Sequence, residues 1–210
     1  MGKDEPAHAY RQKVKSHLNK LPYLIFFVSF IISGCGYLPI SVLLMKDPLT
    51  AEEHNDLGVA YEHEGKYELA IREYKAALKK NNQLVVPLVN IGNVFLKQKN
   101  YSEAEKYYTK VLNIDPYNLE AANNLASLYL IVGKEYQKAL ETLTSAVAFN
   151  KGFPAYAMDT MGVLYYRLGD AEKANFYLTK ACELAEDDVS LIQEIDQHLK
   201  DMGESGCKKE

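Results

Sequence analysis

A small residue followed three positions later by a large aromatic one recurs four times in this chain, and this recurrence constrains the fold more than any other feature. The copies are Gly58 with Tyr61, Gly92 with Phe95, Ala126 with Tyr129, and Gly162 with Tyr165. From 58 to 92, 92 to 126 and 126 to 162 the intervals are 34, 34 and 36 residues. A fixed period of this length is typical of stacked structural units rather than of one central core.

Each copy is followed by a second apolar run with helical spacing. In the first unit this run is Tyr67-x-x-Ala70-x-x-x-Tyr74-x-x-Ala77, and related runs begin at 101, 136 and 171. Gly or Asn separates the two runs of a unit, which favours the end of a helix there. We therefore expect helical hairpins in which the small residue lies where two antiparallel helices cross. One hairpin cannot bury both of its faces, so the hairpins must stack.

The pattern resembles the tetratricopeptide repeat, whose small, aromatic and alanine positions it matches, and Pro116 stands where that family places a proline between repeats. The resemblance implies an all-α fold, a right-handed superhelical solenoid of four helix hairpins. We place the repeats at 51–84, 85–118, 119–154 and 155–188. An apolar stripe over 189–202 predicts a C-terminal capping helix, and 203–210 is expected to be a flexible tail.

The N-terminal segment has the parts of a secretory signal. Residues 1–34 carry five Lys or Arg and two acidic residues, whereas 21–44 carry no charge. A short apolar run ends in Ile32-Ser33-Gly34-Cys35, which resembles the lipobox of bacterial lipoproteins. The resemblance implies that 1–34 is a cleaved signal peptide, that Cys35 is lipidated, and that 35–50 is a lipidated leader.

An uncleaved membrane anchor over 21–44 is the alternative, since it is long enough to span a bilayer. In both interpretations the basic flank stays in the cytoplasm, so that 46–210 lie in the cell envelope, outside the inner membrane. Because Gly36 is not aspartate, the lipoprotein resemblance implies sorting to the outer membrane, facing the periplasm.

Composition argues against several functional classes. The net charge is −4 for the whole chain and +3 for 1–34, which leaves −7 for the remainder, the wrong sign for a nucleic-acid surface. The sequence contains neither a phosphate-binding loop nor a nucleophile elbow, and His54 and His63 are too far apart for one helical metal site. We expect no catalytic residues, no metal, no cofactor and no small-molecule substrate.

Two cysteines remain in the body of the chain. Cys182 stands where other repeats have Leu or Val, and we interpret it as a small core residue. A disulfide with Cys207, which an oxidising compartment permits, is the alternative.

In the tetratricopeptide family the first helix of each hairpin lines the concave, peptide-binding face. The resemblance implies that this face includes Asn55, Val59, Val89, Asn90, Asn93, Leu96, Asn123, Asn124, Ser127, Leu130, Tyr156, Asp159, Val163, Tyr166 and Arg167. Asn amides suit a peptide backbone because each offers a donor and an acceptor, but the same side chains could simply bridge adjacent hairpins. Members of the family that bind chaperones carry a Lys/Arg clamp for a C-terminal carboxylate. Asn93 and Asn124 match the Asn positions of that clamp, but Val89 stands at its first basic position, which argues against binding of that kind.

The sequence therefore predicts a membrane-anchored, non-catalytic scaffold that binds a protein or peptide in a cell-envelope assembly. The alternative is a regulatory or substrate-presenting subunit of an envelope enzyme such as a peptidase. The assembly itself is an analogy with the family.

Overall fold

The computed structural model describes residues 47–207, which form nine α-helices and no strand. They are α3 (Ala51–His63), α4 (Tyr67–Lys80), α5 (Val86–Lys97), α6 (Tyr101–Ile114), α7 (Leu119–Val132), α8 (Tyr136–Asn150), α9 (Ala155–Arg167), α10 (Ala171–Leu184) and α11 (Val189–Asp201). The chain divides into units Met1–Leu49 and Thr50–Glu210, and all nine helices belong to the second. The predicted signal peptide or anchor and Cys35 lie outside the described residues, as does most of the leader. None of the described helices is both long and apolar enough to cross a membrane.

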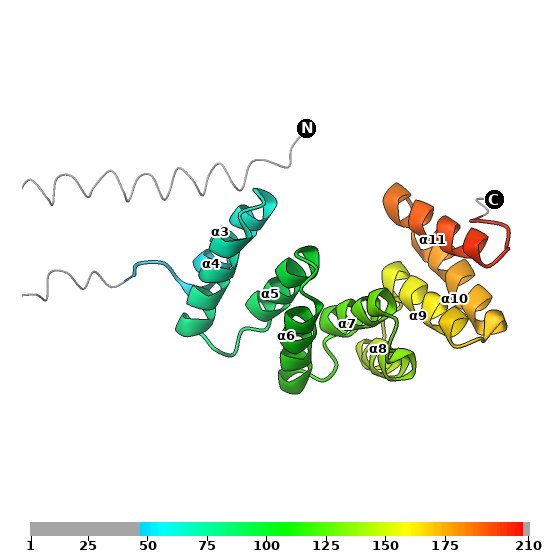
Figure 1. Ribbon diagram of the computed structural model, residues 1–210, viewed down its shortest axis with the longest axis horizontal. Coiled ribbons are helices and arrows are strands. Elements are labelled where there is room, and N and C mark those ends of the chain that lie inside the picture. The colour runs from blue at the N-terminus through cyan, green and yellow to red at the C-terminus, as the bar shows by residue number, and fades with distance from the viewer. Residues whose placement is uncertain (1–46, 208–210) are drawn as a thin grey trace, which may run out of the picture. The chain divides into compact units, whose positions relative to one another are not determined.

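The helices of the second unit form a solenoid of hairpins, as the sequence predicted (Figure 1). Each helix packs against the next one along the chain, within a hairpin and between hairpins. In addition, α3 contacts α5, α5 contacts α7, α7 contacts α9, and α9 contacts α11. The first helices of successive hairpins therefore form a continuous layer, which α11 extends by one helix.

The small residues of the repeating motif lie at tight helix crossings. A Cβ added to Gly58 would lie 2.5 Å from Tyr74 Cε1, and one added to Gly92 would lie 2.5 Å from Tyr108 Cε1. At Gly162 an added Cβ would lie 2.6 Å from Leu178 Cγ. Ala126 is completely buried. The requirement for small residues is thus steric, as expected, because a larger side chain would collide with the second helix of the same hairpin.

The turns inside the hairpins use left-handed backbone. Gly65, Gly133 and Gly169 adopt φ of 70°, 72° and 85°, a conformation that glycine reaches without a steric penalty. In the second hairpin the same turn is made by Lys99 at φ 58°, rather than by the glycine or asparagine that the sequence led us to expect. At this position the lysine side chain carries a steric cost that glycine avoids.

Helix α11 closes the last hairpin by packing on α9 and α10. Ile195 and Leu199 of the predicted apolar stripe are buried, whereas Val189, the first residue of α11, is 63% exposed.

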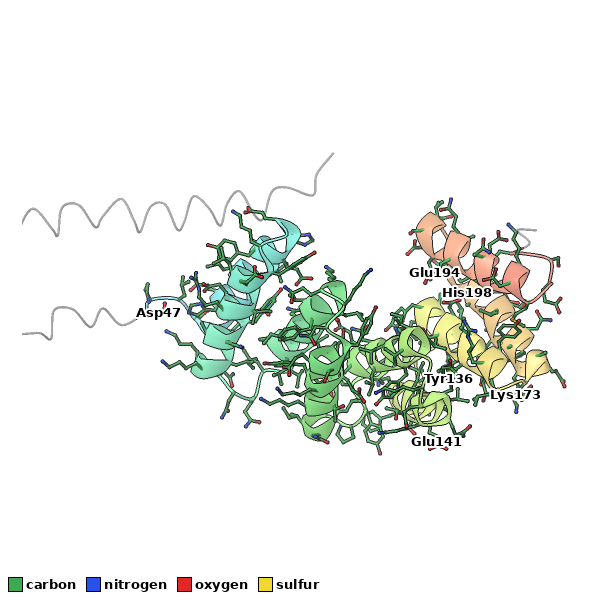
Figure 2. The ribbon with its side chains drawn as sticks, in the orientation of Figure 1. Asp47, Tyr136, Glu141, Lys173, Glu194 and His198 are labelled. Carbon is green, nitrogen blue, oxygen red and sulfur yellow. A yellow bond between two sulfur atoms is a disulfide. The ribbon has the colours of Figure 1, made fainter. Side chains whose placement is uncertain are left out.

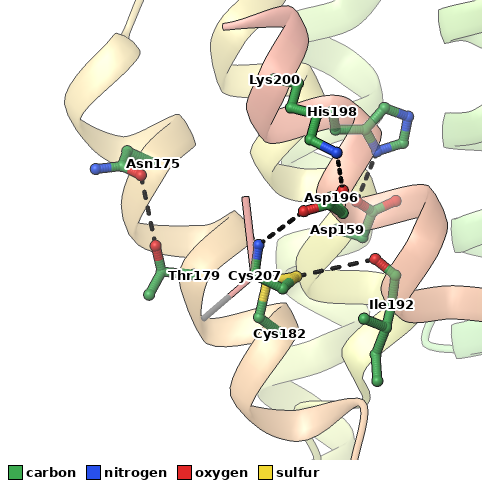
Figure 3. Close-up of a disulfide and its surroundings, with 9 residues drawn as sticks. All are labelled: Asp159, Asn175, Thr179, Cys182, Ile192, Asp196, His198, Lys200 and Cys207. Carbon is green, nitrogen blue, oxygen red and sulfur yellow. Dashed lines mark hydrogen bonds and ion pairs between the residues drawn. A yellow bond between two sulfur atoms is a disulfide. The ribbon is translucent and has the colours of Figure 1, made fainter. Parts of the chain in front are cut away.

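The structure corrects two interpretations at this end of the chain (Figure 3). Cys182 is bonded to Cys207 in a disulfide, so it is not simply a small core residue. Residues 203–207 are therefore not a free tail, and the Cys207 backbone N–H donates a 3.0 Å hydrogen bond to Asp196 Oδ1 on α11. The folding of α10 and α11 against each other brings the two cysteines together across 25 positions of sequence.

Candidate protein-interaction face

The layer of first helices presents a row of side chains that we call the first-helix face. It consists of the predicted binding residues on α3, α5, α7 and α9, which the helix contacts place side by side. Most of these side chains are half-buried. Two of them, Tyr156 and Tyr166, are 41% and 40% exposed.

Four asparagines on this face bond to each other across neighbouring hairpins. Asn90 Nδ2 donates a 3.1 Å hydrogen bond to Asn55 Oδ1, which joins α5 to α3. Asn124 Nδ2 donates a 2.9 Å hydrogen bond to Asn93 Oδ1, which joins α7 to α5. The Tyr108 hydroxyl donates to the same Asn93 oxygen at 2.7 Å. These four asparagines therefore bridge adjacent hairpins, because their amides already form hydrogen bonds within the protein.

Other residues of the face on α5 and α7 do not form such bridges between hairpins. Asn123 Oδ1 is buried, and no hydrogen-bond partner for it occurs among the described residues. Leu96 and Leu130 are partly buried and pack against the core, and Ser127 is half-buried beside them. This stretch offers apolar surface with few free polar groups.

The C-terminal end of the face is open. Tyr166 and Arg167 line a hollow of about 350 Å³ together with Val163, and α11 contributes His198 and Asp201, with Met202 just beyond its end. Apolar and aromatic surface thus lies beside an exposed guanidinium. Of the residues expected from the sequence, three converge here.

Two predicted face residues do not reach solvent. Val89 is 2% exposed and lies in the core, so its side chain is unavailable to a partner. Asp159 is 5% exposed, and its Oδ1 lies 2.7 Å from His198 Nδ1 on α11. The hydrogen bond to Asp159 raises the pKa of His198 above its usual range.

Sequence reasoning gave His198 no role. One feature of the sequence could have indicated a partner for Asp159. It is acidic, whereas the equivalent positions of the other hairpins hold the uncharged residues Asn55, Val89 and Asn123.

Two glutamates link neighbouring hairpins through charged hydrogen bonds. Glu62 accepts from the Tyr74 hydroxyl at 2.7 Å and from Lys97 Nζ at 2.7 Å. Glu105 accepts from the Tyr129 hydroxyl and from Lys134 Nζ, both at 2.8 Å. The bond from Lys134 lowers the pKa of Glu105 below its usual range. These links stiffen the stack on which the face is built.

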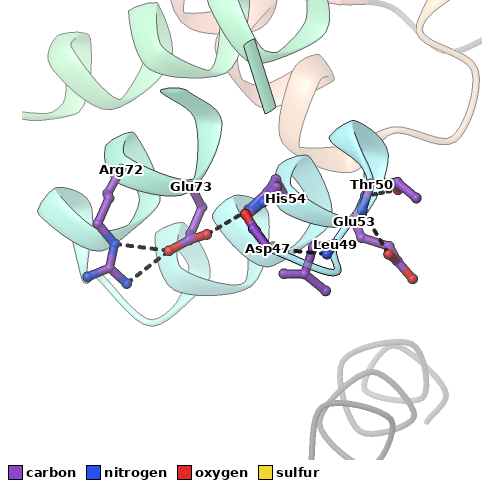
Figure 4. Close-up of polar contacts among 7 residues, drawn as sticks. All are labelled: Asp47, Leu49, Thr50, Glu53, His54, Arg72 and Glu73. Atoms are coloured by element: carbon purple, nitrogen blue, oxygen red, sulfur yellow. Dashed lines mark hydrogen bonds and ion pairs between the residues drawn. The ribbon is translucent and has the colours of Figure 1, made fainter. Parts of the chain in front are cut away.

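A buried polar cluster joins the two helices of the first hairpin (Figure 4). His54 on α3 is 4% exposed, and its Nδ1 lies 2.9 Å from Glu73 Oε2 on α4. The Arg72 guanidinium donates to the other Glu73 oxygen at 3.0 and 2.9 Å. The burial and the partners of His54 indicate a structural role in holding α3 to α4.

Comparisons with known proteins agree with the fold. Family models described as tetratricopeptide repeat match residues 51–84, 86–118 and 155–188. The chain is similar to the type IV pilus assembly protein PilF of Pseudomonas aeruginosa, with 28% identity over 152 residues, covering 65% of this chain and 59% of PilF. It is also similar to human tetratricopeptide repeat protein 6, with 31% identity over 90 residues, covering 43% of this chain and 17% of that protein.

Among solved structures, TTC0263 of Thermus thermophilus superposes with a TM-score of 0.61 at 24% identity, covering 73% of this chain and 83% of that one. The protein MamA superposes with a TM-score of 0.58 at 25% identity, covering 73% and 82%. The chain thus spans less than two thirds of either curated relative, and the structural matches cover most of both chains.

Proposed function

The chain carries tetratricopeptide repeats, and from this premise we propose that it is a non-catalytic scaffold that binds a protein or peptide on the first-helix face, in an assembly of the cell envelope. Tetratricopeptide repeat proteins generally bind protein partners. The observation that carries the proposal is the hollow beside Tyr166 and Arg167, where the face stays open. The paired asparagines further along the face act as the rigid support of that surface.

The chemistry of the hollow indicates the kind of partner. Tyr166 and Val163 offer apolar contact, and Arg167 offers a fixed positive charge. A peptide with an apolar side chain next to an acidic group would match both, since aromatic residues and Arg are frequent hot spots of binding. The proposal includes no nucleic acid, no cofactor and no small-molecule substrate.

The proposed location rests on three supports. The lipobox-like Ile32-Ser33-Gly34-Cys35 favours lipidation at Cys35. The Cys182–Cys207 disulfide fits an oxidising compartment such as the periplasm. The relative PilF is a type IV pilus assembly protein. We propose attachment to the outer membrane facing the periplasm, with a single-pass inner-membrane anchor as the alternative.

Co-purification of the full-length chain from detergent-solubilised envelopes tests the binding face. Tyr166→Glu and Arg167→Glu should each lower recovery of the partner by about tenfold or more, since hot-spot losses exceed about 1.4 kcal/mol. Phe176→Glu is the matched control, because Phe176 is an exposed aromatic residue on α10, a second helix. Equal recovery with all three variants and wild type would exclude this face.

Labelling with palmitate tests the anchor independently. Label should enter the wild-type chain and the Cys207→Ser control, but not Cys35→Ser. An unprocessed and unlabelled wild-type chain would instead support the transmembrane alternative.

A further inference from the structure

Asp159 is the only charged residue in its column of the repeat. The equivalent positions in the earlier hairpins hold Asn55, Val89 and Asn123, all uncharged. Asp159 is nevertheless 5% exposed, and a buried carboxylate needs a partner that offsets its loss of hydration. The partner comes from the capping helix rather than from another repeat.

Helix α11 places two side chains near this carboxylate. His198 Nδ1 lies 2.7 Å from Asp159 Oδ1. Glu194 precedes His198 by four positions, so both project from the same side of α11, as Figure 2 shows. One ligand atom from each of Asp159, Glu194 and His198 lies within 4.8 Å of the other two. Asp159 approaches from the buried side and the exposed Glu194 from the solvent side.

We propose that Asp159, Glu194 and His198 form a binding site for a divalent cation, best suited to Zn²⁺, between α9 and α11. Imidazole nitrogen and carboxylate oxygen are both ligands of zinc, and with three protein ligands a fourth position stays open for water. The two carboxylates offset the charge of the ion. His198 Nδ1 and Asp159 Oδ1 now share a direct 2.7 Å hydrogen bond, so they would have to separate to about 3.3 Å to ligate one tetrahedral Zn²⁺.

The surrounding charges favour a cation. Asp201 lies close enough to act on His198 and lines the same hollow, which adds a third carboxylate to the neighbourhood. Arg167 also lines that hollow and is the opposing positive charge. Zn²⁺ binds only a deprotonated imidazole nitrogen, so zinc binding is measured at mildly alkaline pH.

The position of the site determines its consequence. Its ligands come from two helices whose docking closes the end of the solenoid, so part of the binding free energy stabilises α11 against α9. The cation would therefore fasten the cap to the last hairpin, next to the open end of the first-helix face. This inference does not depend on the proposed function.

Zinc titration of the full chain, purified with the disulfide intact and treated with a chelator, tests the proposal. Calorimetry at mildly alkaline pH should show one saturable site, and zinc should raise the Tm, an effect that renewed chelation reverses. Glu194→Gln and His198→Gln should each weaken affinity by about tenfold or more. His63→Gln, an exposed histidine on α3, is the matched control and should bind as wild type does.

Glu194→Gln keeps the test decisive even if His198→Gln prevents α11 from docking, because Glu194 is exposed. Two results would overturn the proposal. One is a wild-type chain without saturable zinc binding. The other is unchanged affinity in both Glu194→Gln and His198→Gln, which would leave the Asp159–His198 contact as an ion pair only.

Discussion

Asn93 Oδ1 on α5 accepts two hydrogen bonds, one from the Asn124 amide on α7 at 2.9 Å and one from the Tyr108 hydroxyl on α6 at 2.7 Å. A single side chain thus joins the helices of its own hairpin and the next hairpin. Asn93→Ala should lower the free energy of unfolding by about 2 kcal/mol, about 1 kcal/mol for each lost bond. Equilibrium urea unfolding measures this change. Asn55→Ala, which removes one such bond, is the control and should cost about half as much.

The close approach of Gly92 to Tyr108 predicts a penalty for a single methyl group. Gly92→Ala should lower the free energy of unfolding by about 1 kcal/mol, because a steric cost of about 1–3 kcal/mol exceeds the helix-propensity gain of about 1 kcal/mol. Thermal unfolding checks this result. Gly92→Ala combined with Tyr108→Leu reproduces the Ala126 and Leu143 combination of the third hairpin and should relieve the clash. A single variant as stable as wild type would contradict the steric argument.

The left-handed backbone of Lys99 predicts a stabilising substitution. Lys99→Gly should raise the free energy of unfolding by about 0.5–1 kcal/mol, because glycine adopts φ 58° without the steric cost. The neighbouring Gln98 has φ −77°, so Gln98→Gly gains no such relief and should be destabilising. The denaturant midpoint should rise above that of wild type for Lys99→Gly and fall below it for Gln98→Gly. A midpoint for Lys99→Gly at or below that of wild type would contradict the prediction.

The lowered pKa of Glu105 predicts a loss of stability in acid. The contribution of Glu105 is fully present above its unfolded pKa, ordinarily 4.5, and is lost as pH falls through the lowered folded pKa. Glu105→Gln should therefore unfold with a weaker dependence on pH across that window and cost less than about 1 kcal/mol at neutral pH. Glu103→Gln, which breaks a pair with Lys106 inside α6, is the control. An unchanged acid profile in Glu105→Gln would contradict the assignment.

The Cys182–Cys207 disulfide predicts a local effect of reduction. Reduction or Cys207→Ser should free residues 203–207 from α11, expose the Cys207 backbone N–H to exchange, and lower stability by about 2–4 kcal/mol. Hydrogen exchange with mass spectrometry and thermal unfolding measure the two effects. Ser205→Ala should leave both unchanged. If the Cys207 backbone N–H exchanged at the same rate with and without reductant, the disulfide would not hold residues 203–207 against α11 in solution.

The hairpins and their stacking could be predicted because they depend on local and periodic features. Gly58, Gly92 and Gly162 stand at a fixed interval, and only a small residue fits where two helices cross. The helical spacing of the second runs, such as Tyr67 to Ala77, likewise needs no knowledge of distant contacts.

For the first-helix face, the sequence predicted which positions it includes but not the hydrogen bonds or the burial of their side chains. Periodicity placed Asn93 and Asn124 on one face, but it could not decide whether their amides remain free or bond to each other. It also placed Val89 on the face, although burial removes it from contact with a partner. These outcomes depend on the depth and angle at which neighbouring hairpins pack.

The sequence by itself determined that hairpins form and that they must stack, because each hairpin is too thin to bury its own apolar faces. Only the tertiary structure decided which side chains meet across hairpins. It brought His198 to Asp159, which are 39 positions apart, and Cys207 to Cys182, which are 25 positions apart. The physical reason is that such contacts depend on how α11 folds back over α9 and α10, and no local pattern of residues encodes that geometry.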